Sequence, residues 1–326
     1  RHQIAIASGS SQISAPGKFI VSGLPSGLIC DVNTGLITGT PRATGNFKVR
    51  VTVNNAVGSA AAATSTLKVA PLVATASGAY VARVAPSQPL NLNLGGRLDI
   101  ALTDNSAYTA TLQLGGETFR SAGSFNLNSV NSNYSSGIYE SFITFNRANR
   151  SPIQALLLIS TATDTVAGRI EGILSDGTNT AGVIGYRHIW SSLFRSGPPP
   201  FNSMPFAATV GSYKGSVTLN VALEPEAARL GQTDTPEGSG YLALTLTNGG
   251  TATAVGRLSD GTPVTFSTLI SASAEMYLFQ PLNLGTSSLG GFMRLSSLNY
   301  SQLSSDLRWV RGRQPLVERI YQPGFS

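Results

Sequence analysis

The sequence predicts an all-β protein in which a small antiparallel sandwich precedes a larger antiparallel β-barrel of about twelve strands, built from two similar halves. Three observations support this fold class. The 326 residues include 35 glycines and 17 prolines, which suit many short turns and disfavour long helices. Apolar and polar residues alternate over many segments, as they do in half-buried strands. Two long stretches of the chain also repeat each other's order of strands and turns.

Residues 1–72 form the first predicted domain, a small antiparallel sandwich. Between Phe47 and Asn54, apolar side chains alternate with Lys48, Arg50 and Thr52, which gives one strand an inward face and a solvent face. Another predicted strand, residues 64–69, leads into a short linker rich in alanine and proline.

Three motifs in this domain carry a family resemblance: GLPSGL (residues 23–28), NTGLITGTP (residues 33–41) and ATGNFKVRVTVNN (residues 43–55). They resemble the Ig-like, dystroglycan-type cadherin-like domains of bacterial surface proteins. Gly35 and Gly39 suit turn positions with positive φ, and Pro25 and Pro41 fix φ at turns. The resemblance implies an exported spacer or adhesion module, and it brings no catalytic residue.

Residues 73–326 form the second predicted domain, with halves at about 78–192 and 210–312. Four pairs of segments correspond between the halves: residues 78–81 with 211–214, 95–119 with 238–266, 139–145 with 276–282, and 155–159 with 291–295. The dipeptides Asp176-Gly177 and Asp260-Gly261 predict tight hairpins. Because consecutive hairpins form an up-and-down meander, closure into one barrel would remove exposed sheet edges.

The second domain also resembles an uncharacterised repeat region of large secreted proteins of the Verrucomicrobia and Planctomycetes. The runs that carry this resemblance are DGTNTAGVIGYRHIWSS (residues 176–192) and SSDLRWVRG (residues 304–312). It implies an extracellular or cell-surface location and a repeated β architecture, and it implies no activity.

Charge, cysteine content and hydropathy exclude several classes of protein. The net charge of +6 comes from 22 basic and 16 acidic residues, but the basic residues are scattered singly, so no nucleic-acid partner is expected. Cys30 is the only cysteine, which excludes an intramolecular disulfide. No apolar run reaches the roughly eighteen residues of a membrane-spanning helix.

The candidate ligand-binding residues are aromatic. Strand alternation places Tyr186, His188 and Trp190 on one face, and Trp309 lies near the end of the chain. One interpretation is a stacking platform for a sugar ring, with His188 donating hydrogen bonds. The other, which the sequence favours, is a set of aromatic residues that closes one end of a core.

Candidate catalytic and metal-binding residues are few. His2 and His188 are the only histidines, so a His-rich zinc site is disfavoured, and Asp31 is the only carboxylate of the first domain, too few for a calcium cage. Most other carboxylates lie in predicted turns; Glu140 and Glu171 are on predicted strands and would deserve testing as a catalytic pair if both pointed into a barrel. We expect no catalytic residue, no metal and no cofactor.

The sequence therefore predicts a non-catalytic structural or adhesive module of a larger exported bacterial surface protein. Its expected partners are other surface proteins or glycans, with self-assembly through flanking repeats. An alternative is a carbohydrate-binding module that uses the exposed aromatics around Tyr186 and Trp190. A third alternative, an outer-membrane barrel, is disfavoured by short predicted strands and the lack of paired aromatic girdles.

Overall fold

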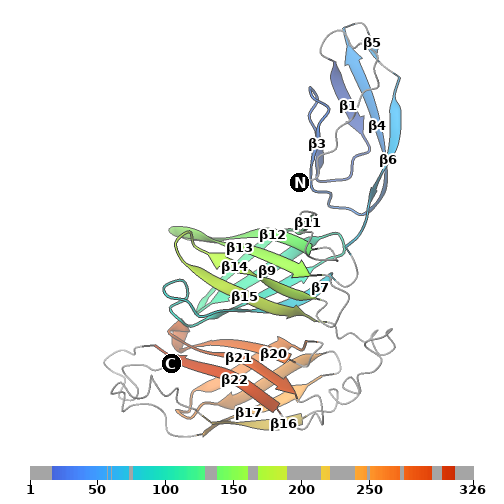
Figure 1. Cartoon of the computed structure of the whole chain (residues 1–326). Coiled ribbons are helices and arrows are strands. Elements are labelled where there is room, and N and C mark those ends of the chain that lie inside the picture. Colours follow the sequence, from blue (N-terminus) through green and yellow to red (C-terminus); the bar gives the residue numbers. More distant parts are fainter. Residues whose placement is uncertain are drawn as a thin grey trace.

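A computed structural model describes residues 17–56, 58–59, 61–72, 76–128, 138–160, 168–188, 214–220, 239–247, 250–271, 275–295 and 303–312. Figure 1 shows three bodies: an elongated N-terminal domain, a barrel-like body below it, and a second barrel-like body stacked beneath the first. All the long elements are strands. The predicted all-β class is therefore confirmed.

The N-terminal domain is a small sandwich built around β4. Its strands are β1 (Lys18–Ser22), β2 (Leu28–Cys30), β3 (Ile37–Gly39), β4 (Gly45–Asn55), β5 (Gly58–Ser59) and β6 (Ala63–Val69). β4 pairs with β1 on one side and with β6 on the other, while β2 and β3 form a separate hairpin. Ile37 and Val49 are the most buried side chains of these strands.

The first barrel follows as a meander. Its strands are β7 (Gly78–Val84), β8 (Gly96–Leu102), β9 (Ala107–Leu114), β10 (Glu117–Ser124), β11 (Asn126–Asn128), β12 (Ile138–Arg147), β13 (Arg150–Ser160), β14 (Arg169–Ser175) and β15 (Thr180–Arg187). They form one nine-stranded antiparallel sheet in the order β10-β9-β8-β7-β15-β14-β13-β12-β11.

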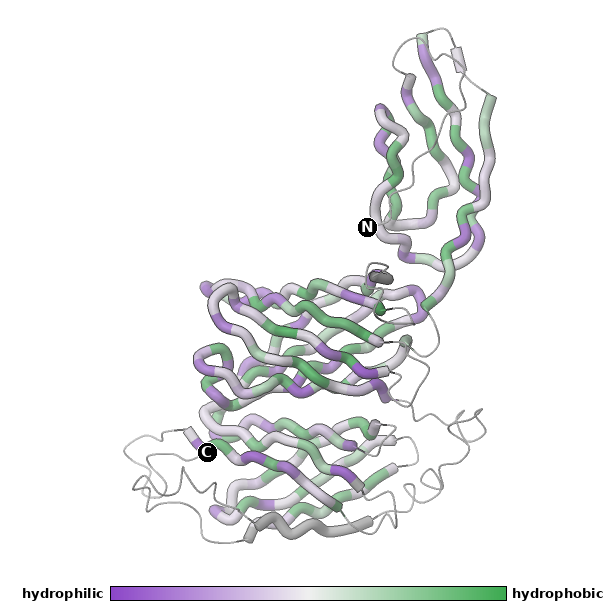
Figure 2. The backbone as a smooth tube through the Cα atoms, viewed as in Figure 1, coloured by the Kyte–Doolittle hydropathy of each residue, from purple (hydrophilic) through white to green (hydrophobic). Residues whose placement is uncertain are grey.

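This sheet curls until its two ends meet. The Ser141 hydroxyl of β12 donates to the Ser124 carbonyl of β10 at 3.1 Å, and Arg150 forms an ion pair with Glu117. Alternate residues point inward, so apolar and polar segments alternate along each strand (Figure 2). The inward side chains, among them Leu98, Leu112 and Leu157, form a single core. The first half of the repeat is therefore a nearly closed barrel with its own interior.

The second barrel contains two described sheets. Its elements are β16 (Lys214–Asn220), β17 (Ser239–Leu246), β18 (Thr251–Arg257), β19 (Pro263–Leu269), β20 (Glu275–Leu282), η3 (Asn283–Gly285), β21 (Ser287–Leu295) and β22 (Leu303–Arg311). β16–β19 form one sheet and β20–β22 the other, and an isolated bridge between Ile270 and Met276 joins them. Residues of both sheets, such as Leu244 and Leu278, share one core.

The strands are distributed differently from the expected single barrel of about twelve strands. β15 pairs with β7, for example Val183 with Val84, so the first half completes a sheet without the second. In the part of the chain that the structure describes, no strand ladder joins the two halves. The repeat thus produces two stacked barrels because each half contains enough alternating strands to enclose a core of its own.

The predicted hairpin turns are confirmed where the structure describes them. Gly177 between β14 and β15 has a φ of 97°, and Gly261 between β18 and β19 has a φ of 84°. These left-handed conformations favour glycine, so each Asp-Gly dipeptide fixes the point at which the chain reverses.

Two glycines on neighbouring strands of the first barrel provide a matched test of packing. A Cβ on Gly172 would lie 2.1 Å from the Leu156 carbonyl oxygen, whereas a Cβ on Gly182 would have nothing within 4 Å. We expect Gly172→Ala to lower the free energy of unfolding by about 1–3 kcal/mol. Gly182→Ala should change it by less than about 1 kcal/mol. Urea denaturation of both variants measures the difference, and equal losses would contradict this packing.

Candidate functional site

Tyr186 lies at the contact between the two barrels. It is on the outer face of β15, beside Val81 of β7, and points toward the second barrel. Its hydroxyl donates to the Leu269 carbonyl at 2.8 Å and accepts the Tyr277 backbone N–H at 2.7 Å. Tyr186 therefore joins β15 to β19 and β20, and its hydroxyl is not available to a ligand.

Other polar contacts between the barrels surround this tyrosine. The Tyr277 hydroxyl donates to the Gly96 carbonyl at 2.7 Å, and the Ser288 hydroxyl donates to the Leu94 carbonyl at 2.7 Å. Arg97 donates from its guanidinium to the Ser267 carbonyl at 2.9 Å. In each case a side chain of one barrel satisfies a backbone carbonyl of the other, so the contact has a fixed register.

The apolar part of this contact is a small cluster of its own. Val81, Tyr277 and Phe279 are buried, and Leu269 and Phe292 pack against them. Tyr277 and Phe292 have ring centroids 5.1 Å apart. We call this cluster together with the hydrogen bonds above the barrel interface. Both barrels contribute outward-facing residues to it, so it is a second apolar layer outside the two cores.

The other predicted ligand-binding residues are dispersed. His188 follows β15 and is half-buried, and its backbone N–H donates to the Ala79 carbonyl at 2.7 Å. Trp309 belongs to β22 and packs against the core of the second barrel. Trp190 lies outside the described residues. Tyr186 and Trp309 thus belong to different surfaces of different barrels, and the carbohydrate-binding alternative stays a prediction that depends on His188 and Trp190.

The carboxylates considered for catalysis lie on the outer face of the first barrel or in turns. Glu140 and Glu171 are on the outer face of the first barrel, on either side of Leu158, and do not point into it. Asp176 accepts the backbone N–H groups of Thr178 and Asn179 in a turn, and the bonds from Asn179 lower the pKa of its carboxyl.

A buried ion pair closes one end of the second barrel. Asp260, in the turn after β18, lies 2.5 Å from the Arg311 guanidinium at the end of β22. Both side chains are less than a tenth exposed. The pair joins the end of β18 in one sheet to the end of β22 in the other. Asp260 therefore has a structural role.

The described ranges contain neither a candidate metal cluster nor a helix that could span a membrane. Within them, no group of three or more histidine, cysteine, aspartate or glutamate side chains could hold a metal ion. None of the described helices is long and apolar enough to span a bilayer.

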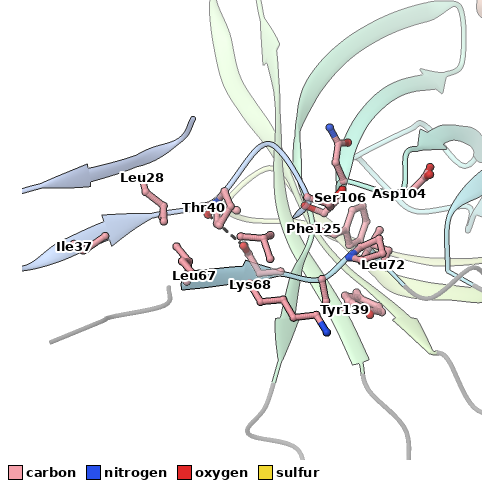
Figure 3. A pocket seen from close by; sticks show the side chains of 17 residues that line it. Leu28, Ile37, Thr40, Leu67, Lys68, Leu72, Asp104, Ser106, Phe125 and Tyr139 are labelled. Atoms are coloured by element: carbon pink, nitrogen blue, oxygen red, sulfur yellow. Dashed lines mark hydrogen bonds between the residues drawn. The ribbon is translucent and has the colours of Figure 1, made fainter. Parts of the chain in front are cut away.

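The largest feature at the other junction is a cavity of about 400 Å³ between the N-terminal domain and the first barrel. Figure 3 shows Leu28, Ile37 and Leu67 entering from the N-terminal domain, with Phe125 and Tyr139 facing them from the barrel. The lining is mainly apolar, with Thr40, Lys68, Asp104 and Asn105 at its border. The cavity is a candidate ligand site at a domain junction, where such sites often occur.

Hydrogen bonds fix the border of this junction cavity. The Asn105 amide donates to the Arg42 carbonyl at 2.9 Å, and the Leu72 N–H donates to the Asp104 carbonyl at 2.8 Å. The linker itself is anchored, because Leu72 and Ala76 are buried in the core of the first barrel. Side-chain contacts therefore join the N-terminal domain to the first barrel, in addition to the covalent linker.

A second hollow, of about 810 Å³, lies at one end of the first barrel, where Leu284 and Gly285 of the second barrel also line it. Arg147, Arg150, Glu117 and Asp176 line it. These charges pair with one another: Arg150 with Glu117, and Arg147 with Asp176 at 3.8 Å. The hollow therefore presents an internally neutralised surface.

Sequence reasoning found Tyr186 but missed its partners. Tyr277 and Phe279 are large aromatic residues at outward positions of β20, where a free-standing barrel would carry polar side chains. That departure from alternation was visible in the sequence. No such signal marks Arg97 and Gly96 in the sequence. Arg97 contributes a guanidinium hydrogen bond and Gly96 a backbone carbonyl, and neither changes the alternation of apolar and polar residues.

Comparison with known proteins bears on the N-terminal domain. Residues 4–70 match the family described as Putative Ig domain. The domain is therefore Ig-like, as its motifs indicated. The matched stretch includes all of β1–β6 and ends beside the junction cavity. No curated protein and no solved structure matches the chain.

Removal of the Tyr186 hydroxyl tests the barrel interface. Tyr186→Phe leaves the Tyr277 N–H and the Leu269 carbonyl without this partner, so we expect a loss of about 1–3 kcal/mol in the free energy of unfolding. Amide exchange at Tyr277 should accelerate. Tyr241→Phe, on a residue that is 54% exposed, serves as the control. Equal effects of the two variants would contradict this role.

The same tyrosines make stability depend on alkaline pH. Burial raises the pKa of Tyr80, Tyr186 and Tyr277 well above the ordinary value of about 10. Above pH ~10 the unfolded chain releases these protons while the folded chain keeps them, so stability is present below that pH and is lost above it. We expect the urea midpoint to fall above pH ~10, less steeply for Tyr186→Phe. A folded protein in which all ten tyrosines ionise together at about pH 10 would contradict this.

Proposed function

We propose that this chain is a non-catalytic structural and adhesive module of a larger exported surface protein, in which an Ig-like domain and two barrels form one continuous unit. The observation that carries this proposal is that both junctions are fixed by side chains. Leu72 and the Asn105–Arg42 hydrogen bond hold the first, and Tyr186 with Tyr277 holds the second.

A spacer must keep its ends at a constant distance, and flexible linkers would defeat this. Inter-domain motion is the default unless an interface is extensive and apolar. Here the linker between the Ig-like domain and the first barrel is short and partly buried, and the barrels share an apolar cluster. These features support a module whose work is to hold position.

The use of reactive side chains for structure also supports this function. Asp260 is in a buried ion pair, Asp176 organises a turn, and Glu140 and Glu171 are on an outer face. Tyr186 is in the barrel interface. The residues that the sequence offers for chemistry are largely engaged in maintaining the fold.

The rigidity of the first junction can be tested with Leu72→Ala. This change removes apolar contacts that anchor the linker, so we expect the largest dimension measured by small-angle X-ray scattering to increase and its distribution to broaden. Ile29→Ala, on an Ig-like residue that is 71% exposed, is the matched control. A wild-type protein that already shows a broad distribution would refute the fixed spacer.

Export is tested separately on the organism that makes the protein. Antibodies raised against residues 78–188 should label intact cells or the culture medium. Labelling that requires lysis would show that the protein works inside the cell and would refute a surface module, whatever the scattering result.

A further inference from the structure

An exposed apolar row crosses the outer face of the first barrel. Phe142 of β12 lies opposite Leu156 of β13, which lies opposite Ile173 of β14. Phe142 is 76% exposed and Ile173 is 54% exposed, with Leu156 half-exposed between them. Gly182 of β15 follows at the end of this row, with open space above it. We call Phe142, Leu156 and Ile173 the exposed row.

The repeat shows what this face does in the second barrel. The correspondence of residues 139–145 with 276–282 places Phe142 at the position of Phe279. In the strand ladders Leu156 is the partner of Phe142, whereas the partner of Phe279 is Gly290, and Phe292 lies two residues further along β21 on the same face. Phe279 and Phe292 belong to the barrel interface, where they pack against the first barrel. The same outer face is therefore covered in one barrel and open in the other.

The receiving side of the barrel interface also has a counterpart. The first barrel receives the second with Val81, Tyr186, the Gly96 carbonyl and Arg97. Gly96-Arg97-Leu98 corresponds to Gly240-Tyr241-Leu242, and Leu98 and Leu242 are both fully buried. Tyr241 thus stands where Arg97 stands, and it is 54% exposed. The second barrel therefore exposes an aromatic side chain at this one position of the corresponding face, while Lys214 stands where Val81 stands in the sequence correspondence.

We propose that the exposed row of one chain docks on the Tyr241 face of the second barrel of another copy, in the way that the two barrels of one chain already pack. In Figure 1 the second barrel is on the opposite side of the first barrel from β12 and β13. The two open faces therefore point away from the existing interface, and the contact extends the stack of barrels.

Charge at the borders of the two faces supports this pairing. Glu140 and Glu171 border the exposed row, and Glu171 also pairs with Arg169 at 2.5 Å. Arg257 is the cross-strand neighbour of Tyr241 and is exposed. With Arg169 included, the border of the exposed row keeps one net negative charge from two carboxylates and one arginine, which favours contact with Arg257 over contact between two identical faces.

Docking of unlike faces has a consequence for assembly. A contact between two different surfaces leaves one face of each kind free, so copies add to an open stack and do not stop at a closed dimer. Ig-like domains would then project from a column of barrels. This docking rests on the correspondence between the two halves of the chain. It does not require that the protein be exported to the cell surface.

Sedimentation equilibrium of the full chain tests the docking. The wild type should associate in a concentration-dependent way, and Phe142→Asp and Tyr241→Asp should each weaken association at least about tenfold. A mixture of the two variants should form a one-to-one complex, because each supplies the face that the other lacks. Ile29→Asp, with similar exposure in the Ig-like domain, should associate as the wild type does.

Three results would overturn the proposal: a wild type that stays monomeric, association that Phe142→Asp leaves unchanged, or variants that fail to complement each other. If Phe142→Asp alone prevents association and the mixture does not complex, two identical faces meet and unlike docking is wrong. Ile173→Asp repeats the test at a second position of the exposed row, and unchanged melting temperatures show that the variants fold.

Discussion

The antiparallel ladder between β15 and β7 determines the rest of this architecture. It joins strands about a hundred residues apart in the sequence and lets the first half of the repeat enclose its own core. Once that ladder forms, the second half cannot contribute strands to the same barrel and must close separately. Two separate barrels stay together only if their outer faces contact each other. Val81, Tyr186 and Tyr277 form that contact.

The barrel interface combines apolar burial with hydrogen bonds that specify register. Burial alone would allow the two surfaces to slide, because apolar contact has no direction. The tyrosine hydroxyls remove that freedom, since each finds one particular backbone group on the other barrel. The Ig-like domain is attached by the same combination, with Leu72 buried and Asn105 bonded to a backbone carbonyl. The contacts that join the three bodies therefore come from a small number of side chains at two junctions.

Repetition gives the molecule a means of assembly that a single barrel would lack. Phe279 of the second half is covered within the chain, whereas its counterpart Phe142 in the first half is exposed. Phe142 is a large apolar side chain that is exposed to solvent on the outer face of its strand. Its counterpart Phe279 is buried in the barrel interface, which suggests a similar contact as the reason for the phenylalanine at position 142. A large apolar residue kept at an exposed position is a common mark of an interaction surface.

The sequence by itself determined the all-β class, the Ig-like domain and the Asp-Gly turns, because alternation and turn chemistry are local properties. It also singled out Tyr186 on one face of β15, since the two-residue period of a strand assigns alternate residues to opposite faces. It could not decide whether that face meets solvent, a ligand or another barrel. Only the tertiary structure placed Tyr186 against Leu269 and left Phe142 open, because long-range pairing of strands decides which outward faces are covered.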